Sequence, residues 1–273
     1  MFETRQQNSG WRIFLRMAET TFVASARKVR GTHRNAIIAL LLTISQAVLF
    51  VGSFYLIFAV MGMREAAIRG DYMLYLLSGI YIYMCHIKAL SAVAGSEGPT
   101  SPMMQHAPMN TIVAILSGAL SSLYTNTLAL LVLLFILHSL IQPIEIHDWS
   151  FAFMLYLLGW FSGCAIGTIF LAMKPWAPDL AKILQQIYVR LNMIASGKMF
   201  VANMMPGIII SMLDWNPLFH IIDQMRGAMF VNYFPHHSNW QYPVIMSIAF
   251  LMIGLIAEFY TRQRASASWD AGR

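Results

Sequence analysis

Charged residues are scarce in this sequence. Asp, Glu, Lys and Arg make up 11% of the 273 residues, whereas a soluble domain carries about 25%. Hydrophobic residues account for 58%, and the mean hydropathy is positive. This composition excludes an ordinary soluble domain and indicates a protein of the lipid bilayer. The net charge of +6 does not indicate nucleic-acid binding, because in a membrane protein the positions of Lys and Arg matter more than their total.

Cysteine and catalytic signatures are also lacking. Cys85 and Cys164 both lie in apolar runs, and their spacing fits neither a disulfide framework nor a metal site. The sequence contains no HExxH, no GxSxG and no GxxxxGK[ST] phosphate loop. His236 and His237 adjoin, but neighbouring side chains point apart and make a weak metal signal. We therefore expect a chain that is not an enzyme and that itself binds no metal and no cofactor.

Six stretches are apolar enough to cross a bilayer as helices, which takes about 20 residues each. They are Ala36 to Met63, Tyr72 to Val93, Thr111 to Leu140, Phe151 to Met173, Leu180 to Ala202 and Tyr242 to Tyr260. Polar residues interrupt the fifth, where Lys182, Gln186 and Arg190 form one stripe at helical spacing. The sequence thus predicts an all-α membrane protein with a six-helix transmembrane domain over residues 36–260.

Basic residues are concentrated on one side of this arrangement. The N-terminal segment 1–35, two loops and the tail 261–273 share that side and hold most of the Lys and Arg, while Arg64, Arg69 and Arg226 lie opposite. Because Lys and Arg favour the cytoplasmic side, we expect both termini to be cytoplasmic. The opening residues are polar and charged, so no cleavable signal peptide is expected.

Residues 203–240 are too apolar for a loop and too broken for a span. Pro206 and Gly207 interrupt the run from Met204 to Leu213, which is only half as long as a spanning helix of about 20 residues. We expect a re-entrant or interfacial helical elbow between the fifth and sixth spans, on the side opposite the termini, with Pro206 and Pro217 at its corners. Broken backbone at membrane depth must lie against protein or a water-filled cavity.

Two cytoplasmic segments could contact a partner. Before the first span, Trp11, Phe14 and Phe22 recur at helical spacing while basic residues fall on other faces, which predicts an amphipathic helix on the membrane surface. Its basic residues suit either lipid head groups or a docking protein. The loop from Gly95 to Asn110 is either an ordinary turn or an adaptable, Met-rich docking surface. The candidate docking residues in it are Glu97, Met103, Met104 and His106.

Basic groups inside the expected spans lack acidic neighbours. Glu258 is the only acidic residue there and lies near the end of the last span. Ionisable groups in a bilayer are costly and are functional suspects, so an anion or a lipid phosphate is their expected partner. Snorkelling to an interface is the alternative, strong for Lys198 and weak for Arg190. With the deeper aromatic residues, the candidate substrate pathway comprises Tyr81, Tyr83, Lys88, Trp160, Arg190 and Lys198.

Small residues repeat in the fourth span. Gly159, Gly163 and Gly167 recur at four-residue spacing, which lets another helix approach closely. This pattern indicates packing rather than activity.

The segment WNPLFHIIDQMRGAMFVNYFP, from Trp215 to Pro235, resembles the membrane subunits of type 2 ABC exporters, and within them the capsular polysaccharide and O-antigen export permeases. The residues that carry this elbow motif are Asn216, Pro217, Asp223, Arg226 and Gly227. The six-span layout and the basic N-terminal helix agree with the resemblance. The loop from Gly95 to Asn110 departs from it, because the corresponding loop of the family usually carries basic residues and this one has none.

The resemblance implies a permease that pairs with a second copy of itself and with separate cytoplasmic ABC ATPase subunits. ATP and Mg would be bound by those ATPase subunits. The implied cargo is a lipid-linked, anionic, capsular-type polysaccharide that crosses the plasma (inner) membrane of a bacterium. Periplasmic export proteins and membrane lipids are further implied partners, and nucleic acid is not.

Two other transporter classes remain open at this point. A type 2 ABC exporter of another lipid or drug would have the same fold, because a fold does not decide its cargo. A proton-coupled secondary carrier would be expected to place acidic residues in the membrane core, where this sequence has only Glu258.

Overall fold

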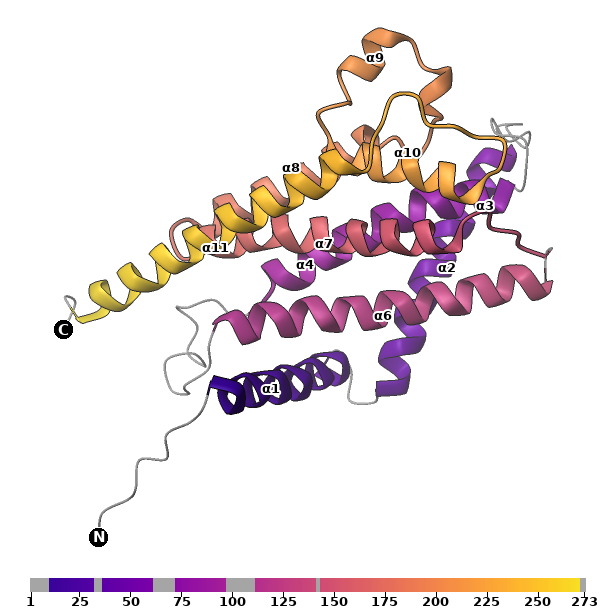
Figure 1. Ribbon diagram of the computed structural model, residues 1–273. Coiled ribbons are helices and arrows are strands. Elements are labelled where there is room, and N and C mark those ends of the chain that lie inside the picture. The colour runs from indigo at the N-terminus through magenta and orange to yellow at the C-terminus, as the bar shows by residue number, and fades with distance from the viewer. Residues whose placement is uncertain (1–9, 32–35, 61–71, 97–110, 141–142, 271–273) are drawn as a thin grey trace.

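In the computed structural model, residues 10–31, 36–60, 72–96, 111–140 and 143–270 are described, and every regular element within these ranges is a helix. Most of the long helices run along one axis, with the expected elbow toward one end and the C-terminus at the other (Figure 1). The predicted all-α class is therefore confirmed for the part of the chain that the structure describes.

Four helices are long and apolar enough to cross a membrane, judged on the described residues alone. The first runs from Tyr72 to Ala94 and consists of α3 (Tyr72–Leu76), a π-helical turn η1 (Leu77–Tyr81) and α4 (Ile82–Ala94). The others lie in α6 (Thr111–Leu140), α7 (Trp149–Met173) and α11 (Gln241–Asp270). They correspond to the second, third, fourth and sixth expected spans, although α11 continues beyond the expected end at Tyr260.

The first and fifth expected spans are not among these four. α2 (Ala36–Val60) matches the first and contains no charged residue, whereas α8 (Pro178–Ala195) stops before the expected end at Ala202. It stops because Gly197 has φ +72°, a left-handed conformation that ends helices at this position. Lys198 consequently lies in the loop after α8 instead of inside a span. The count of six is not confirmed, since the described residues support four.

α7 lies at the centre of the fold and packs most extensively on α4 and α11. In both the α3–α4 span and α7, 72% of the most apolar window is buried, against 33% in α6 and 22% in α11. The glycine repeat allows this contact, because a Cβ at Gly163 would lie 2.2 Å from the His86 carbonyl oxygen and one at Gly167 would lie 2.7 Å from that of Leu90. The predicted packing role of the repeat is confirmed.

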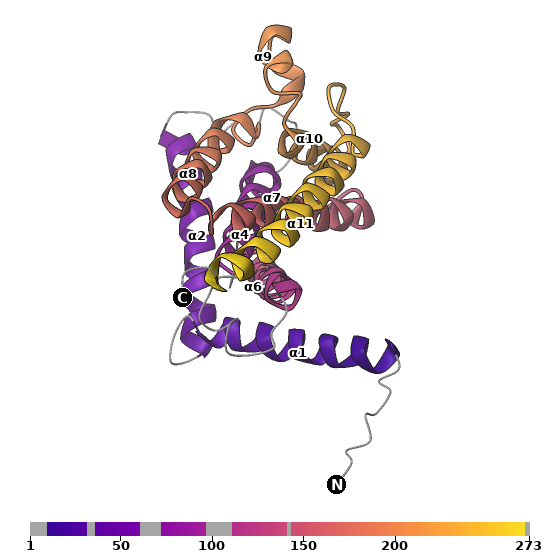
Figure 2. The same ribbon diagram turned by 90° about the vertical axis from the view of Figure 1, so that its left-hand side faces the viewer.

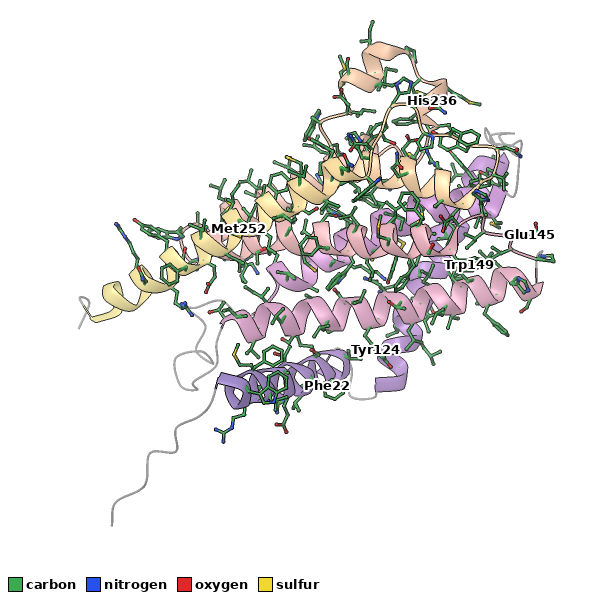
Figure 3. All side chains as sticks on the ribbon, viewed as in Figure 1. Phe22, Tyr124, Glu145, Trp149, His236 and Met252 are labelled. Atoms are coloured by element: carbon green, nitrogen blue, oxygen red, sulfur yellow. The ribbon has the colours of Figure 1, made fainter. Side chains whose placement is uncertain are left out.

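α1 (Gly10–Gly31) lies across the molecule from the elbow and packs along α6 (Figure 2). Its buried face is small and polar, with Thr21 and Ser25, while Trp11 and Phe14 are exposed. Phe22 also points away from the protein (Figure 3). An apolar face left open by the protein is the arrangement expected of a helix that rests in the membrane interface.

The elbow, residues 203–240, begins within a 3₁₀ turn η2 (Ala202–Met204) and contains two helices, α9 (Gly207–Ser211) and α10 (Pro217–Met229). α9 projects from the body (Figure 1), and its Ile208 and the following Met212 are exposed. α10 is almost entirely buried against α7, α11 and η1. Pro206 directly precedes α9 and Pro217 is the first residue of α10, so both stand where the sequence predicts corners.

Candidate functional site

Arg226 of α10 is the largest fully buried side chain among the described residues. Its Nη1 donates to the Phe200 carbonyl at 2.5 Å and its Nη2 to the Lys198 carbonyl at 2.9 Å. The guanidinium also lies over the Tyr75 ring, 4.6 Å from its centroid. A planar fork can bridge two carbonyls and stack on a ring at once, which fastens the elbow both to the loop after α8 and to α3.

Lys198 is fully buried beside Arg226, at the junction of four elements. Its Nζ lies over the rings of Tyr83, 3.5 Å from the centroid, and Phe50, 5.5 Å away. Aromatic faces attract cations, and more strongly where water is excluded. The structure thus brings Lys198 together with Tyr83 from the predicted pathway set, with Arg226 from the elbow motif, and with Phe50 of α2.

Gly79 of η1 makes this junction sterically possible. A Cβ at residue 79 would lie 2.8 Å from the Lys198 carbonyl oxygen and 3.1 Å from Arg226 Nη2. The π-helical turn therefore presents bare backbone where the two basic residues approach it. Such turns often occur at functional positions within helices.

Asn216 connects the elbow to α8. Its Oδ1 accepts the N–H of Leu218 at 3.0 Å and so caps α10, with Pro217 next in the favoured first helical position. Its Nδ2 donates to Asn192 Oδ1 at 3.0 Å and to the Ala195 carbonyl at 3.0 Å. The sequence Asn216-Pro217 thus both starts α10 and holds it against the end of α8.

Asp223 and its neighbours hold the returning part of the elbow. The Asp223 carboxylate accepts the hydroxyls of Tyr233 and, at 2.7 Å, of Ser238. Gln224 Nε2 donates to the Ser238 carbonyl at 2.8 Å. Gly227 leaves room for Pro235, since a Cβ there would lie 2.9 Å from the proline Cδ. Every residue of the elbow motif therefore helps to position the elbow itself.

The other pathway candidates lie apart from this junction. The Tyr81 hydroxyl donates to the Asn126 carbonyl, and Trp160 Nε1 donates to the Ala119 carbonyl at 3.0 Å, so both side chains bind α6. Lys88 is half-buried on α4, and Arg190 is exposed on α8. The predicted pathway set therefore divides into a buried junction, contacts to α6 and an exposed polar stripe.

His86 is a buried link that the sequence did not reveal. Its Nδ1 lies 2.8 Å from Ser162 Oγ, and its Nε2 lies 2.9 Å from the Tyr188 hydroxyl. Because Ser162 donates to the Gly159 carbonyl, it accepts from His86 Nδ1–H, and Nε2 accepts from Tyr188. His86 thus joins α4, α7 and α8, over sequence separations of 76 and 102 residues that no local spacing could predict.

Two lysines hold the other end of α4. Lys28 of α1 donates to Ser96 Oγ at 2.9 Å and to the Ala114 carbonyl at 3.1 Å, and Lys174 donates to the Ala94 carbonyl. Cations are favourable beside the C-terminal carbonyls of a helix. The predicted docking residues follow Ser96 in the sequence and lie outside the described residues. They are Glu97, Met103, Met104 and His106.

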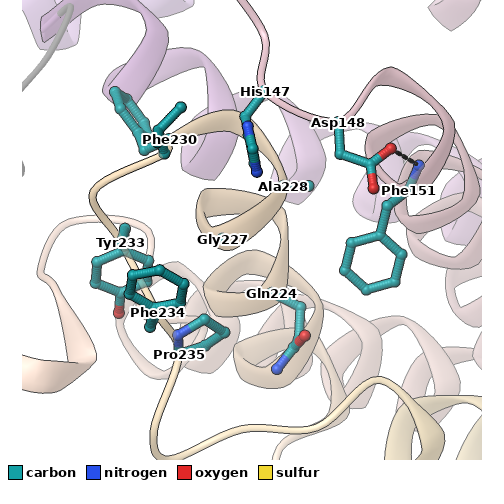
Figure 4. A pocket seen from close by; sticks show the side chains of 11 residues that line it. His147, Asp148, Phe151, Gln224, Gly227, Ala228, Phe230, Tyr233, Phe234 and Pro235 are labelled. Atoms are coloured by element: carbon teal, nitrogen blue, oxygen red, sulfur yellow. Dashed lines mark hydrogen bonds between the residues drawn. The ribbon is translucent and has the colours of Figure 1, made fainter.

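A cavity of about 220 Å³ lies on the elbow beside the start of α7 (Figure 4). Its wall combines aromatic rings, among them Phe151 and Phe234, with the polar side chains of Asp148 and Gln224. The Phe151 N–H and the Ser150 hydroxyl bind the Asp148 carboxylate and hold its pKa below the usual range. No group of three His, Cys, Asp or Glu suited to a metal occurs in the described ranges.

These features indicate a helical, multi-pass membrane protein, in which residues 203–240 are held to the other helices by hydrogen bonds. Two proteins from Escherichia coli, both named polysialic acid transport protein KpsM, are similar to the chain. One is 25% identical over 191 residues, which are 70% of this chain and 73% of the relative. The other is 25% identical over 178 residues, or 65% and 67%. No family model matches the chain. The two relatives confirm the resemblance to ABC-exporter permeases of polysaccharide transport.

Proposed function

We propose that this chain is the permease subunit of an ATP-driven ABC exporter that moves a lipid-linked, anionic, capsular-type polysaccharide across the bacterial inner membrane. The observation that carries the proposal is its similarity to KpsM over about 70% of its length. The all-helical fold, with four helices able to cross a membrane among the described residues, supports it.

The proposal includes six spans, with α2 and α8 added to the four. α2 has 25 residues without a charge, and α8 has 18, or about 27 Å of helix against a hydrocarbon core of about 30 Å. Both termini would then be cytoplasmic and the elbow periplasmic. A cysteine introduced at exposed Asn239 of the elbow should react with an impermeant maleimide on intact cells, whereas one at Gln263 should not.

The exposed polar stripe of α8 supports two parts of the proposal, namely that the chain pairs with a second copy of itself and that its cargo is anionic. Lys182, Gln186 and Arg190 are all exposed on one side of the helix, next to the side that faces α4. Lys182 already lies 4.0 Å from the Asp179 carboxylate, so Arg190, farther along the helix, is the basic group that calls for a polar surface or an anion opposite it. Two copies that meet along this stripe would enclose a basic path for the polysaccharide, with separate ATPase subunits on the cytoplasmic side.

The cavity on the elbow supports a sugar cargo at the exit. Rings beside a carboxylate and an amide offer both an apolar platform and hydrogen-bonding groups, the combination that orients a polar ligand in a mostly apolar pocket. Phe151 and Asp148 are the residues we expect a passing sugar to touch.

The test is reconstitution. The chain should co-purify with a Walker-type ATPase encoded beside it and move lipid-linked polysaccharide in proteoliposomes only when that ATPase and Mg-ATP are present. Arg190→Gln should reduce the rate while the complex still assembles, and Arg264→Gln, at an exposed arginine of α11 outside both candidate docking segments, is the matched control. Transport without any ATPase would contradict the exporter class. ATP-driven export of a lipid without sugar would contradict only the cargo.

A further inference from the structure

A second cavity, of about 140 Å³, lies between α6, α7, η1 and α10. Its lining is almost wholly apolar. Three helices contribute most of this lining. It includes Leu131 and Leu134 of α6, Trp149, Ala152 and Phe153 of α7, and Met225 and Met229 of α10. The cavity on the elbow shares none of these residues, so the two are separate spaces.

The hydroxyl groups in its wall are already hydrogen-bonded to protein. Tyr81 donates to the Asn126 carbonyl, and the hydroxyls of Thr127 and Tyr156 lie 2.9 Å apart. A water needs two to four polar partners, and apolar cavities of about 150 Å³ stay dry and accept small apolar ligands. The occupant that fits this cavity is therefore hydrocarbon, without a polar group inside.

The mouth of the cavity opens on the exposed surface of two helices that are able to span a membrane. Leu131, Trp149 and Phe153 stand around it with 60%, 59% and 58% of their surfaces exposed, on two helices that are able to span a membrane. Trp149 lies at the first turn of α7 (Figure 3), the position at which tryptophan marks the membrane–water interface. A chain that entered here would come from the leaflet on the elbow side.

The back wall belongs to the elbow. Met225 and Met229 of α10 are only 1% and 9% exposed, so bulk lipid outside the protein does not reach them. Methionine adapts its shape to irregular apolar ligands. A hydrocarbon chain in the cavity would therefore touch the elbow helix directly.

We infer that this cavity binds a short segment of one acyl chain of a bilayer phospholipid, inserted between α6 and α7 with the lipid head group at the level of Trp149. The continuity of the mouth with the lipid-facing surface favours a bilayer lipid. The exposed polar stripe, which we assign to the cargo, belongs to a different helix. The bound chain couples the surrounding leaflet to α10 and does not depend on what the protein transports.

The full-length protein in nanodiscs that contain a phospholipid with a mid-chain diazirine provides the test. After irradiation, mapping of adducts by mass spectrometry should find modified Met225 and Met229 as well as the exposed residues around the mouth. Adducts confined to exposed side chains would overturn the inference. Stronger labelling of the methionines by a polyprenyl diazirine than by the phospholipid would overturn the choice of occupant.

Variants that fill the cavity can be compared with a control variant that is altered outside it. Ala152→Phe places a ring in the space and should lower the yield of adducts on Met225 by about tenfold, because the site is then overpacked. Leu134→Trp fills it from α6 and should have the same effect if the first variant does not fold. Leu116→Phe, at an exposed position of α6 outside the cavity, should leave the yield unchanged. An undiminished yield in a folded cavity-filled variant would also overturn the inference.

Discussion

At the scale of single residues, the contacts of Arg226 depend on the planar shape of its guanidinium group as well as on its charge. Arg226→Leu leaves the carbonyls of Lys198 and Phe200 without their buried donors, so we expect the free energy of unfolding to fall by about 3 kcal/mol. Arg226→Lys keeps the charge but cannot bridge both carbonyls, and should recover only part of the loss. The measurement is thermal unfolding in detergent. Arg190→Leu, at an exposed arginine, should change the midpoint little, and an equal loss there would contradict this account.

Gly79 permits a second test at the same junction. Gly79→Ala should lower thermal stability, because its Cβ would lie 2.8 Å from the Lys198 carbonyl oxygen. Gly52→Ala on α2 meets nothing within 4 Å and should be neutral or slightly stabilising, as alanine favours helix over glycine by about 1 kcal/mol. If both variants behaved alike, the close approach of the loop to η1 would not matter for folding.

Sequence reasoning found some residues of the junction and missed others. Asn216 and Arg226 stand in a recognisable motif, so the sequence singles them out, although it does not reveal their partners. Apolar length predicts a span that includes Lys198, because length and hydropathy do not reveal the left-handed conformation of Gly197 before it. His86 gave no signal, since Ser162 and Tyr188 reach it only through the packing of α4, α7 and α8.

At the scale of elements, the contact between α4 and α7 should respond in graded fashion to its glycines. A Cβ would lie 2.2 Å from its nearest neighbour at Gly163, 2.7 Å at Gly167 and 3.1 Å at Gly159. We expect Gly163→Ala to reduce the yield of folded protein most and Gly159→Ala least. Size-exclusion chromatography of detergent extracts measures this, and a reversed order would contradict the observed crossing.

The helices with a uniform apolar sequence were the best predicted elements. The bounds of the α3–α4 span, α6 and α7 agree with expectation to within two residues at each end, because length and hydropathy suffice there. α8 was predicted less well, since its polar stripe and its C-terminal glycine make it amphipathic and shorter. The elbow was predicted as broken apolar chain, but the burial of α10 depends on tertiary contacts that composition does not contain.

At the scale of the whole molecule, the association of two copies can be tested through α8. Both native cysteines are buried, and their replacement by alanine gives a background for introduced ones. Gln186→Cys, on the polar stripe, should form a disulfide between copies in membranes under mild oxidation. Leu191→Cys, at an exposed position on another side of the helix, is the matched control. Equal cross-linking at both positions would indicate random collision instead of a defined interface.

Side chains from other elements contact the helix from Tyr72 to Ala94 at both of its ends. Lys28 and Lys174 hold one end, at Ser96 and Ala94, and Arg226 lies against Tyr75 near the other. Its 23 residues form a rod of about 34 Å. A thrust on the rod at its lysine-held end would travel along its axis to the elbow, and its long contact with α7 would keep it from buckling. The π-helical turn η1 is the one departure from α-helical geometry in this rod, so we expect a displacement between its two held ends to be taken up there.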